Sequence, residues 1–513
     1  MNLTTPMAMA AANLQSWLDP AHGYRLTGGF GIAHDTGRLW DALLRYEQVS
    51  DFLMPAEAEA AMLQNLHAMF DNPDGLLFVP AGLHWTPPRF ELHSLREGLL
   101  TLTARIRNRH DDWAADAARR MLQTVERIVR DDGTIDPRRL DYFQYMGEDR
   151  PLHRTHTTLD GSDYTAVTGR FIEALVWHYE LTGEALALEL AQLFFDYHLE
   201  HTVNADGSPR AEIFSPDNQG HTHSYLGTLR GLLRHGLLTG RRDCVDTVYE
   251  TYRDAVSNHL IKPSGWVAHD LGTTLFHDNH GNPLAECTSA CDVVQLALWL
   301  ALEDGRVELL DDVERYLRAR VLPAQIQESD TIGNPGMAVP AQHIGGWGCC
   351  EYPYSTKAPC MPDYPGAILH SLTDVYANIC TRSATGLHVN LHADYAGEGV
   401  TIHSERDEAG RLTITLDTAD NLFIRIPGWA PPASVRITVD GDDRPVERVG
   451  PAAQISGDTL SPPGTVMMTY ALPERRSSET TPVGDVYELL WRGDEIAGIN
   501  PNEGPRPVYP DLA

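Results

Sequence analysis

A recurring helical pattern is the feature that most constrains the fold of this chain. Over roughly its first three quarters, segments such as GRFIEALVWHYELTG and DVVQLALWLALEDG carry apolar residues at three- and four-residue spacing, which is typical of amphipathic helices. Several of these segments end at a glycine placed as a C-cap, namely Gly133, Gly183, Gly240 and Gly305. These ends recur roughly every 50 to 65 residues, about the length of a helical hairpin with its loop.

Such a repeat is compatible with two architectures. An open helical solenoid would repeat more evenly and would have shorter loops than this chain. The loops here are long and rich in His, Asp, Trp and Gly, as in DRPLHRTHTTLDGSDYTAVTG. We therefore expect a closed ring of hairpins, an (α/α)6 toroid, to form a catalytic domain over residues 1–383.

The remainder of the chain is expected to form a second domain. Within residues 384–513, segments such as RLTITLD and SVRITVDG alternate apolar and polar residues and are bounded by Gly, Asp and Pro. This pattern predicts a β-sandwich, which is followed by a Pro-rich C-terminal tail. The fold class is thus mainly α, with the toroid first and the sandwich second.

Charge and the N-terminal sequence limit the partners and the compartment. A formal net charge of −31 would repel nucleic acid and anionic membranes, so neither is expected as a partner. The segment MNLTTPMAMAAANLQSWLDP has no basic n-region and no long apolar core, and no apolar stretch is long enough to span a bilayer. We expect a cytoplasmic protein whose cysteines are reduced.

Five of the seven cysteines fall in two clusters, each beside an acid. One cluster combines Glu286 and Cys287 with Cys291 one turn further along the helix. The second cluster, GWGCCEYPYSTKAPC, contains Cys349, Cys350 and Cys360. Thiolates together with a carboxylate suit Zn²⁺, so the pattern predicts a zinc site. Unrelated buried thiols are the alternative.

Charged and aromatic residues near the predicted helix starts are candidates for substrate binding. His221 and His223 head one helix and Arg170 heads another, where a cation opposes the helix dipole, so a functional role is favoured. A solvated Arg170 is the alternative. Aromatic faces stack well on sugars, although each such residue could equally belong to a core. The aromatic candidates of these loops are Tyr164, Trp266 and Trp347.

These features together resemble a known family. A toroid followed by a sandwich, with an acid and cysteines at a helix start and Cys-Cys in a later loop, is similar to the zinc-thiolate β-L-arabinofuranosidases. GRFIEALVWHYELTG resembles a helix that carries an active-site His there, with Arg170 in the His position. His221 falls where a sugar-contacting His is expected, and LFIRIPGWAPPASVRITVDG resembles the sandwich of that family.

The resemblance implies a retaining glycoside hydrolase that acts on a small glycoside or oligosaccharide, such as a β-L-arabinofuranoside. It implies that Cys349 is the nucleophile and that Cys349, Cys350 and Glu286 bind zinc. Asp270 lies at about the spacing expected of the acid/base residue, with Asp278 and Glu351 as weaker candidates. Thr288 occupies the position of the third cysteine ligand, and the residues that could replace it are Cys287, Cys291 and Cys360.

Two other classes of function remain open from the sequence. A lyase or an epimerase on the same toroid would use His221, His223 or Tyr164 for proton abstraction and would need no thiolate. A non-catalytic sugar-binding protein would fit a site that has lost some of its ligands. The predicted partner is a small carbohydrate, and the sandwich is either a lid on the toroid or the surface of a homodimer.

Overall fold

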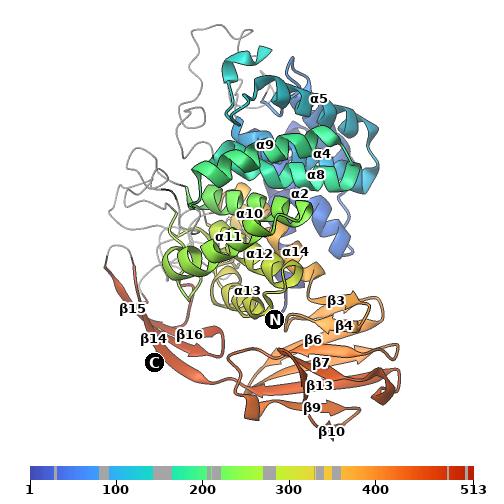
Figure 1. Ribbon diagram of the computed structural model, residues 1–513, viewed down its shortest axis with the longest axis vertical. Helices are drawn as coiled ribbons and strands as arrows, with labels where there is room; N and C mark the ends of the chain where they lie inside the picture. Colours follow the sequence, from blue (N-terminus) through green and yellow to red (C-terminus); the bar gives the residue numbers. More distant parts are fainter. Residues whose placement is uncertain are drawn as a thin grey trace.

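The computed structural model describes residues 1–27, 32–79, 92–141, 165–204, 210, 221–269, 285–328, 330, 340–348, 360–481, 484–502 and 507–512. Four residues predicted for the site lie outside these ranges, namely Tyr164, Asp270, Cys349 and Cys350, as do Asp278 and Glu351. The described chain is helical up to α14 (Asp363–Ala377), and the strands of the larger sheets begin at β3 (Cys380–Ser383). The predicted order, a helix-rich part followed by a strand-rich part, is confirmed (Figure 1).

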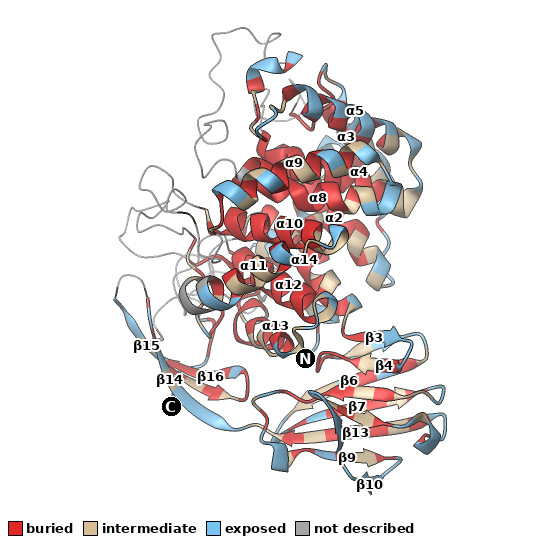
Figure 2. Ribbon diagram, in the orientation of Figure 1, coloured by how far each residue is buried: buried red, intermediate tan, exposed pale blue. Residues whose placement is uncertain are grey.

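Six helices of the described chain form a closed series of contacts. Each packs against the next, and the last packs against the first. In this order they are α2 (Ile32–Val49), α4 (Leu95–Arg109), α8 (Arg170–Thr182), α10 (Thr222–Thr239), α12 (Cys287–Glu303) and α14. We call these six the ring helices. They are largely buried (Figure 2), and α12 is buried at every position from Cys287 to Ala301, as expected for a helix enclosed on all sides.

Further helices pack outside the ring. The helices α1, α5, α9, α11 and α13 contact α14, α4, α8, α10 and α12 respectively. Their bounds are α1 Thr4–Ser16, α5 Asp112–Ile128, α9 Ala185–His201, α11 Arg242–Glu250 and α13 Leu310–Tyr316, and α3 spans Ala56–Phe70. Along the chain, ring helices and outer helices therefore alternate as the amphipathic repeat predicts.

The glycines predicted as C-caps have this role in two of the ring helices. Gly183 and Gly240 are the C-caps of α8 and α10, with φ of 71° and 69°. This left-handed backbone favours glycine because it has no Cβ. Gly133 and Gly305 also have positive φ, of 82° and 77°, in the turns that follow α5 and α12.

Glycines on α10 allow α8 to approach it closely. A Cβ atom at Gly231 would lie 2.8 Å from Cβ of Ile172 and 2.9 Å from the carbonyl oxygen of Gly169. At Gly227 a Cβ atom would lie 2.8 Å from Cγ of Arg170. Any side chain at these two positions would push the helices apart, so the glycines fix Arg170 against α10.

The described residues of the strand-rich part form three sheets. A six-stranded sheet has the order β10-β9-β13-β7-β6-β5, a five-stranded sheet has the order β11-β12-β8-β4-β3, and a three-stranded sheet has the order β14-β15-β16. All pairs are antiparallel except β4 with β8. Burial alternates along β13, which gives the sheet one buried and one more exposed face.

The remaining strand bounds are as follows. They are β4 Gly386–Val389, β5 Tyr395–Gly397, β6 Val400–Arg406, β7 Ala409–Leu416, β8 Leu422–Arg425, β9 Arg436–Val439, β10 Asp442–Arg444, β11 Glu447–Val449, β12 Ala452–Ile455, β13 Gly464–Ala471, β14 Glu474–Thr480, β15 Val486–Arg492 and β16 Glu495–Asn500. A separate two-stranded sheet pairs β1 (Leu18–Asp19) with β2 (Arg25–Leu26).

The C-terminal sheet is tied to the helical part. The Glu479 carboxylate on β14 accepts hydrogen bonds from the backbone N–H and the hydroxyl of Ser264, at 2.9 and 2.6 Å. The five cysteines within the described ranges are all buried. No helix in those ranges is both long and apolar enough to cross a membrane.

Candidate active site at the N-termini of the ring helices

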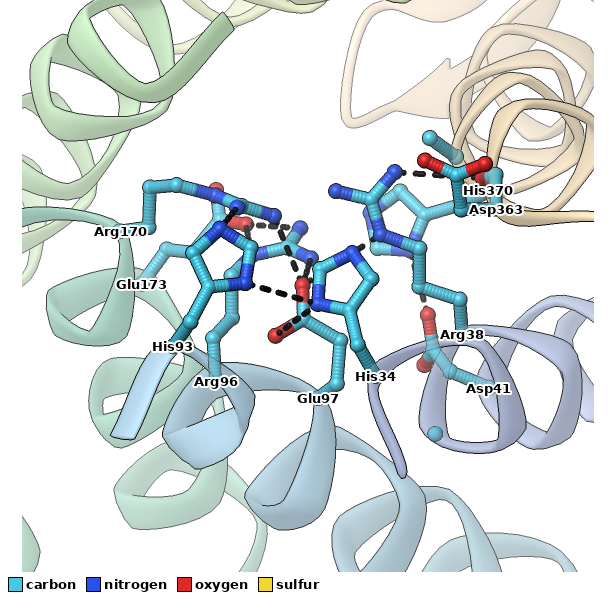
Figure 3. Close-up of polar contacts among 12 residues, drawn as sticks. His34, Arg38, Asp41, His93, Arg96, Glu97, Arg170, Glu173, Asp363 and His370 are labelled. Carbon is cyan, nitrogen blue, oxygen red and sulfur yellow. Dashed lines mark hydrogen bonds and ion pairs between the residues drawn. The ribbon is translucent and has the colours of Figure 1, made fainter. Parts of the chain in front are cut away.

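Each ring helix brings a polar residue to its N-terminal end. These residues are His34 on α2, His93 in the 3-10 turn before α4, Arg170 at the start of α8, His221 as the N-cap of α10, Glu286 as the N-cap of α12 and Asp363 at the start of α14. Contacts join His34, His93, Arg170 and Asp363, as Figure 3 shows, and join His221 to Glu286. Glu286 also interacts electrostatically with Asp363, so the six N-termini meet at one end of the ring. We call this set, with the residues that contact it, the candidate site.

Glu286 forms the most solvent-accessible part of the candidate site together with two histidines. His221 Nε2 lies 3.2 Å from Glu286 Oε2, and His269 Nε2 lies 3.9 Å from the same oxygen. An ionised carboxylate only accepts, so His221 donates to Glu286 from Nε2. Its other ring nitrogen, Nδ1, lies 3.0 Å from Ser224 Oγ. The Glu286 side chain is only 2% exposed, whereas His221 is 34% exposed, so His221 connects this buried carboxylate to solvent.

The Glu286 carboxylate is held in its ionised form. Burial works to raise its pKa, but the neighbouring His221 and His269 outweigh this and lower the pKa. Thr288 Oγ1 donates a hydrogen bond to the other carboxylate oxygen, Oε1. Thr288, which stands where the resemblance expects a cysteine, therefore supports Glu286 through its hydroxyl.

His223 is bonded to protein groups on both sides of its ring. Arg38 Nη2 donates to His223 Nε2 at 2.7 Å, so the ring proton is on Nδ1, which donates to Asp292 at 2.5 Å. Burial, together with the nearby Arg170 and Arg38, lowers the pKa of His223 well below its ordinary value. His223 is thus a neutral, fully bonded link between Arg38 and Asp292.

Arg170 is buried, so the alternative of a solvated arginine is wrong. Its side chain is 1% exposed, and it donates to His93 Nε2 at 3.0 Å and to Glu97 Oε1 at 2.7 Å. His93 Nδ1 in turn lies 3.1 Å from His34 Nδ1. Burial lowers the pKa of Arg170 to about 10, which still leaves it charged near neutral pH. Figure 3 shows this series of side-chain contacts, which leads from Arg170 on α8 to His34 on α2.

A network of buried ion pairs lies behind these residues. Glu173 pairs with Arg96 and, at 2.9 Å, with Arg230, and Arg230 also reaches Asp292 at 2.7 Å. Arg96 continues to Glu97 at 3.1 Å. Because desolvated charges are costly unless they are paired, each member constrains the position of the next. The network therefore holds Arg170 and His223 in place.

Asp363 carries a buried carboxyl oxygen that is not hydrogen bonded within the residues that the structure describes, namely Oδ1. Its backbone carbonyl accepts from Arg38 at 3.2 Å. Burial raises the pKa of Asp363 to about 6, Arg38 opposes this rise, and the charge of Glu286 adds to it. The pKa values of Asp363 and Glu286 are thus shifted in opposite directions, as in an acid and a base that share one site.

Three groups of described residues in the candidate site have the donor atoms for a metal ion. The ligand atoms of His221, His269 and Glu286 lie within 4.8 Å of one another, and so do those of His34, His93 and Glu97 and those of His34, Asp35 and Asp363. Two imidazoles and a carboxylate suit zinc, and the first group reaches solvent through His221. The second group fits a cation poorly, because Arg38, Arg96 and Arg170 already surround Glu97.

The described cysteines that were predicted as ligands are all buried. Cys287 is the first residue of α12 and is 0% exposed. Burial raises the pKa of Cys291 well above its ordinary value. The Cys360 thiol donates to the carbonyl oxygen of Met361 at 3.4 Å. The thiolate prediction continues to depend on Cys349 and Cys350.

The two described tryptophans of the predicted sugar site are core residues. Trp266 and Trp347 are 1% and 0% exposed. The Trp347 indole N–H donates to the carbonyl oxygen of Val321 at 2.7 Å. The structure therefore brings together His221, His223, Arg170 and Glu286 and places both indoles in the core.

Several residues of the candidate site were not predicted from the sequence, chiefly His34, His93, Glu97, His269 and Asp363. A signal for two of them exists in ELHSLREGLL, where His93 and Glu97 interrupt an apolar helix at i and i+4. Both face the ring centre, where an unpaired polar residue would be costly.

No family model matches the sequence, and no curated protein matches it. Solved structures do share its fold. A GH127 β-L-arabinofuranosidase from Geobacillus stearothermophilus T6 has a TM-score of 0.59 at 16% identity, over 95% of this chain and 80% of that one. A second GH127 β-arabinofuranosidase gives 0.61 at 15% identity, over 95% and 78%. A sugar epimerase from a ruminal bacterium gives 0.51 at 11% identity, over 73% and 98%. At such identities the likeness establishes the fold alone.

Proposed function

We propose that this protein is a retaining glycoside hydrolase that acts on a small glycoside or oligosaccharide, with β-L-arabinofuranosides as the first substrates to test. The observation that carries the proposal is the meeting of Glu286, His221, His269 and Asp363 at the N-terminal end of the ring. The shared fold with two β-arabinofuranosidases supports it. In this proposal the ring is an (α/α)6 toroid and the larger sheets form a β-sandwich beside it.

The proposed reaction proceeds by two displacements. The Cys349 thiolate attacks the anomeric carbon, and the bond from that carbon to the leaving oxygen breaks, which gives a covalent glycosyl–enzyme. Water then attacks the same carbon and releases the thiolate. Two inversions give net retention of configuration. His221, which is partly exposed beside Glu286, is proposed to hold a sugar hydroxyl.

The leaving oxygen needs a proton, for which there are two proposed donors. Asp270 is the candidate from the sequence, and Asp363 is the candidate from the geometry. Burial raises the pKa of Asp363 to about 6, so an appreciable fraction is protonated near neutral pH. The same group, once ionised, would take a proton from the attacking water in the second step.

Zinc is the proposed cofactor. Bound zinc would keep a thiol in its thiolate form at neutral pH. The proposed ligands are Glu286, Cys349 and Cys350, with Cys287 as the fourth candidate. The described residues also offer His221 and His269 beside Glu286. Both sets contain Glu286 but differ in their other ligands. They therefore make different predictions for the cysteine and histidine variants.

The test is the release of 4-nitrophenol from aryl furanosides and pyranosides, with the anomer of the sugar product followed by ¹H NMR. We expect first-formed product of retained configuration and a loss of turnover in Cys349→Ser and Glu286→Gln. Glu405→Gln, a partly exposed position on β6 of the six-stranded sheet, is the matched control and should keep full activity. Inverted product, or full activity in Cys349→Ser, would contradict the mechanism.

An epimerase is the second candidate function. The favouring observation is the pair of imidazoles at Glu286, since a partly exposed His221 could move a proton at a sugar carbon. The fold shared with a sugar epimerase, at a TM-score of 0.51, is compatible with it. Incubation of free sugars in D₂O separates the two functions, because only an epimerase that works by proton abstraction incorporates deuterium at a carbon of the sugar.

A further inference from the structure

A cavity lies at the other end of the ring from the candidate site. It has a volume of about 290 Å³ and is lined by residues from all six ring helices. Arg45 and Arg107 lie towards the C-terminal ends of α2 and α4, and Trp177 and Arg234 lie likewise on α8 and α10. The candidate site uses the N-terminal ends of the same helices. We call this second space the rear cavity.

The acidic groups of the rear cavity are already neutralised or hydrogen bonded. Asp374 accepts from the Trp299 indole N–H at 2.8 Å and from Gln295 at 3.1 Å. Glu303 pairs with Arg234 at 2.5 Å. Neither carboxylate therefore needs a further cation.

Arg45 and Arg107, on the neighbouring helices α2 and α4, are less fully hydrogen bonded than these acids. Arg45 donates one hydrogen bond to Asp41, from Nε at 2.9 Å, and its guanidinium lies over the Trp177 ring at 4.8 Å. Arg107 is partly buried, and within the part of the chain that the structure describes it forms no hydrogen bond and no ion pair. Burial lowers its pKa and the positive charge of Arg45 lowers it further, while the more distant carboxylates of Asp41 and Glu180 oppose the fall without bonding to Arg107. Two guanidinium groups thus lie on adjacent ring helices, and among the described residues one of them has no acceptor.

The helix ends explain part of this arrangement but not all of it. Helix C-termini carry partial negative charge, so cations near them stabilise the ring helices. That effect favours arginine at these positions. It provides no hydrogen-bond acceptor for the Arg107 guanidinium, whose donors need acceptors in a partly desolvated space.

We propose that the rear cavity binds a small organic or inorganic oxyanion, a carboxylate or a phosphate group, between Arg45 and Arg107. Guanidinium groups match the geometry of both anions through paired N–H donors. The volume is at the lower end of the range for small-molecule sites. The site is separate from the proposed catalytic end and does not depend on the proposed reaction.

Binding is tested on the full chain with inorganic phosphate and with malonate, by isothermal titration and by thermal melting at constant ionic strength, with chloride as the reference anion. We expect saturable binding of at least one of the two anions. Arg107→Gln should weaken it about tenfold, because a charged bidentate partner is lost. Arg253→Gln, an exposed arginine outside the cavity, is the matched control and should bind as the parent does.

Two further measurements make the outcome decisive. His221→Ala should leave anion binding unchanged, which separates the rear cavity from the candidate site. Arg107→Lys keeps the positive charge and replaces the glutamine variant if that variant folds poorly. It should bind the anion with an affinity between those of the parent and Arg107→Gln. Preference for phosphate indicates a phosphate ester as the ligand, and preference for malonate indicates a carboxylate. No saturable binding, or equal binding in the parent and Arg107→Gln, would overturn the proposal.

Discussion

His221 and Glu286 lie 65 positions apart in the sequence, and their side chains meet at 3.2 Å. Each is the N-cap of a ring helix, so the meeting is a direct result of placing α10 beside α12. Neither side chain accepts a hydrogen bond from a backbone N–H of its own helix as a cap would. Their bonds within the first turn are to side chains, including Ser224 for His221 and Thr288 for Glu286. Both are therefore available for chemistry, with Glu286 buried and His221 reaching solvent.

The first prediction concerns His221. Replacement by alanine should lower turnover at least about a hundredfold, the usual contribution of a positioned acid–base or binding imidazole. Because the side chain is 34% exposed, the melting temperature should change little. Hydrolysis of an aryl glycoside measures the first effect and calorimetry the second. His403→Ala, an exposed histidine on β6, is the control, and an equal loss in both variants would contradict a specific role.

The second prediction concerns the metal ligands. Elemental mass spectrometry of the protein purified under reducing conditions should find about one zinc per chain, and Glu286→Gln should reduce it. If the thiolates hold the ion, Cys350→Ser removes it and His269→Ala does not. If the described histidines hold the ion, His269→Ala removes it and Cys350→Ser does not. Zinc that is retained in full by all three variants would rule out both ligand sets.

The third prediction concerns the stability of the metal-free protein as pH changes. The pKa of Asp363 is about 6 in the folded protein, against an ordinary value of 3.8 for an unfolded chain, so the folded protein holds this proton more tightly. The stability contributed by the protonated carboxyl is complete below pH 3.8 and is lost as pH rises through 6. Asp363→Asn does not titrate, so its stability relative to the parent should improve by roughly 2 kcal/mol between pH 4.5 and 7. Urea unfolding in the presence of a chelator measures this difference, and a difference that is constant with pH would be evidence against the shift.

The fourth prediction concerns the buried ion pairs. Glu173→Gln leaves Arg96 and Arg230 without their shared carboxylate and should lower the free energy of unfolding by about 3–5 kcal/mol. Glu180→Gln makes the same change two turns later on the same helix, where the side chain is 35% exposed. That control should cost less than about 1 kcal/mol. Similar losses in the two variants would show that the network is not what fixes this end of α8.

The sequence was sufficient for the elements of the fold because their signals are local. The apolar spacing of DVVQLALWLALEDG predicts α12, and the period of two in RLTITLD predicts β7. Gly183 and Gly240 mark helix ends through a backbone conformation that other residues rarely adopt. Each of these signals is contained within a few residues.

The candidate site could be predicted only in part because its contacts are not local. His221, Arg170 and Glu286 were found by their position at helix starts or by the resemblance. His34 and Asp363 were missed because each is an ordinary polar residue until the ring brings them within 4.8 Å of each other. Trp266 shows the opposite error, since a loop tryptophan looks available for a sugar and is in fact buried.

The contact between α14 and α2 also has a consequence for how the chain folds. His370 on α14 bonds Asp41 on α2 across 329 positions, and this junction closes the ring. A nascent chain therefore carries an open arc of apolar helices until its last ring helix leaves the ribosome. Such long-range closure slows folding. Chains released before α14 is made would lack Asp363 and would expose the faces of α2 and α12 that α14 covers, which makes them targets for chaperones and proteases.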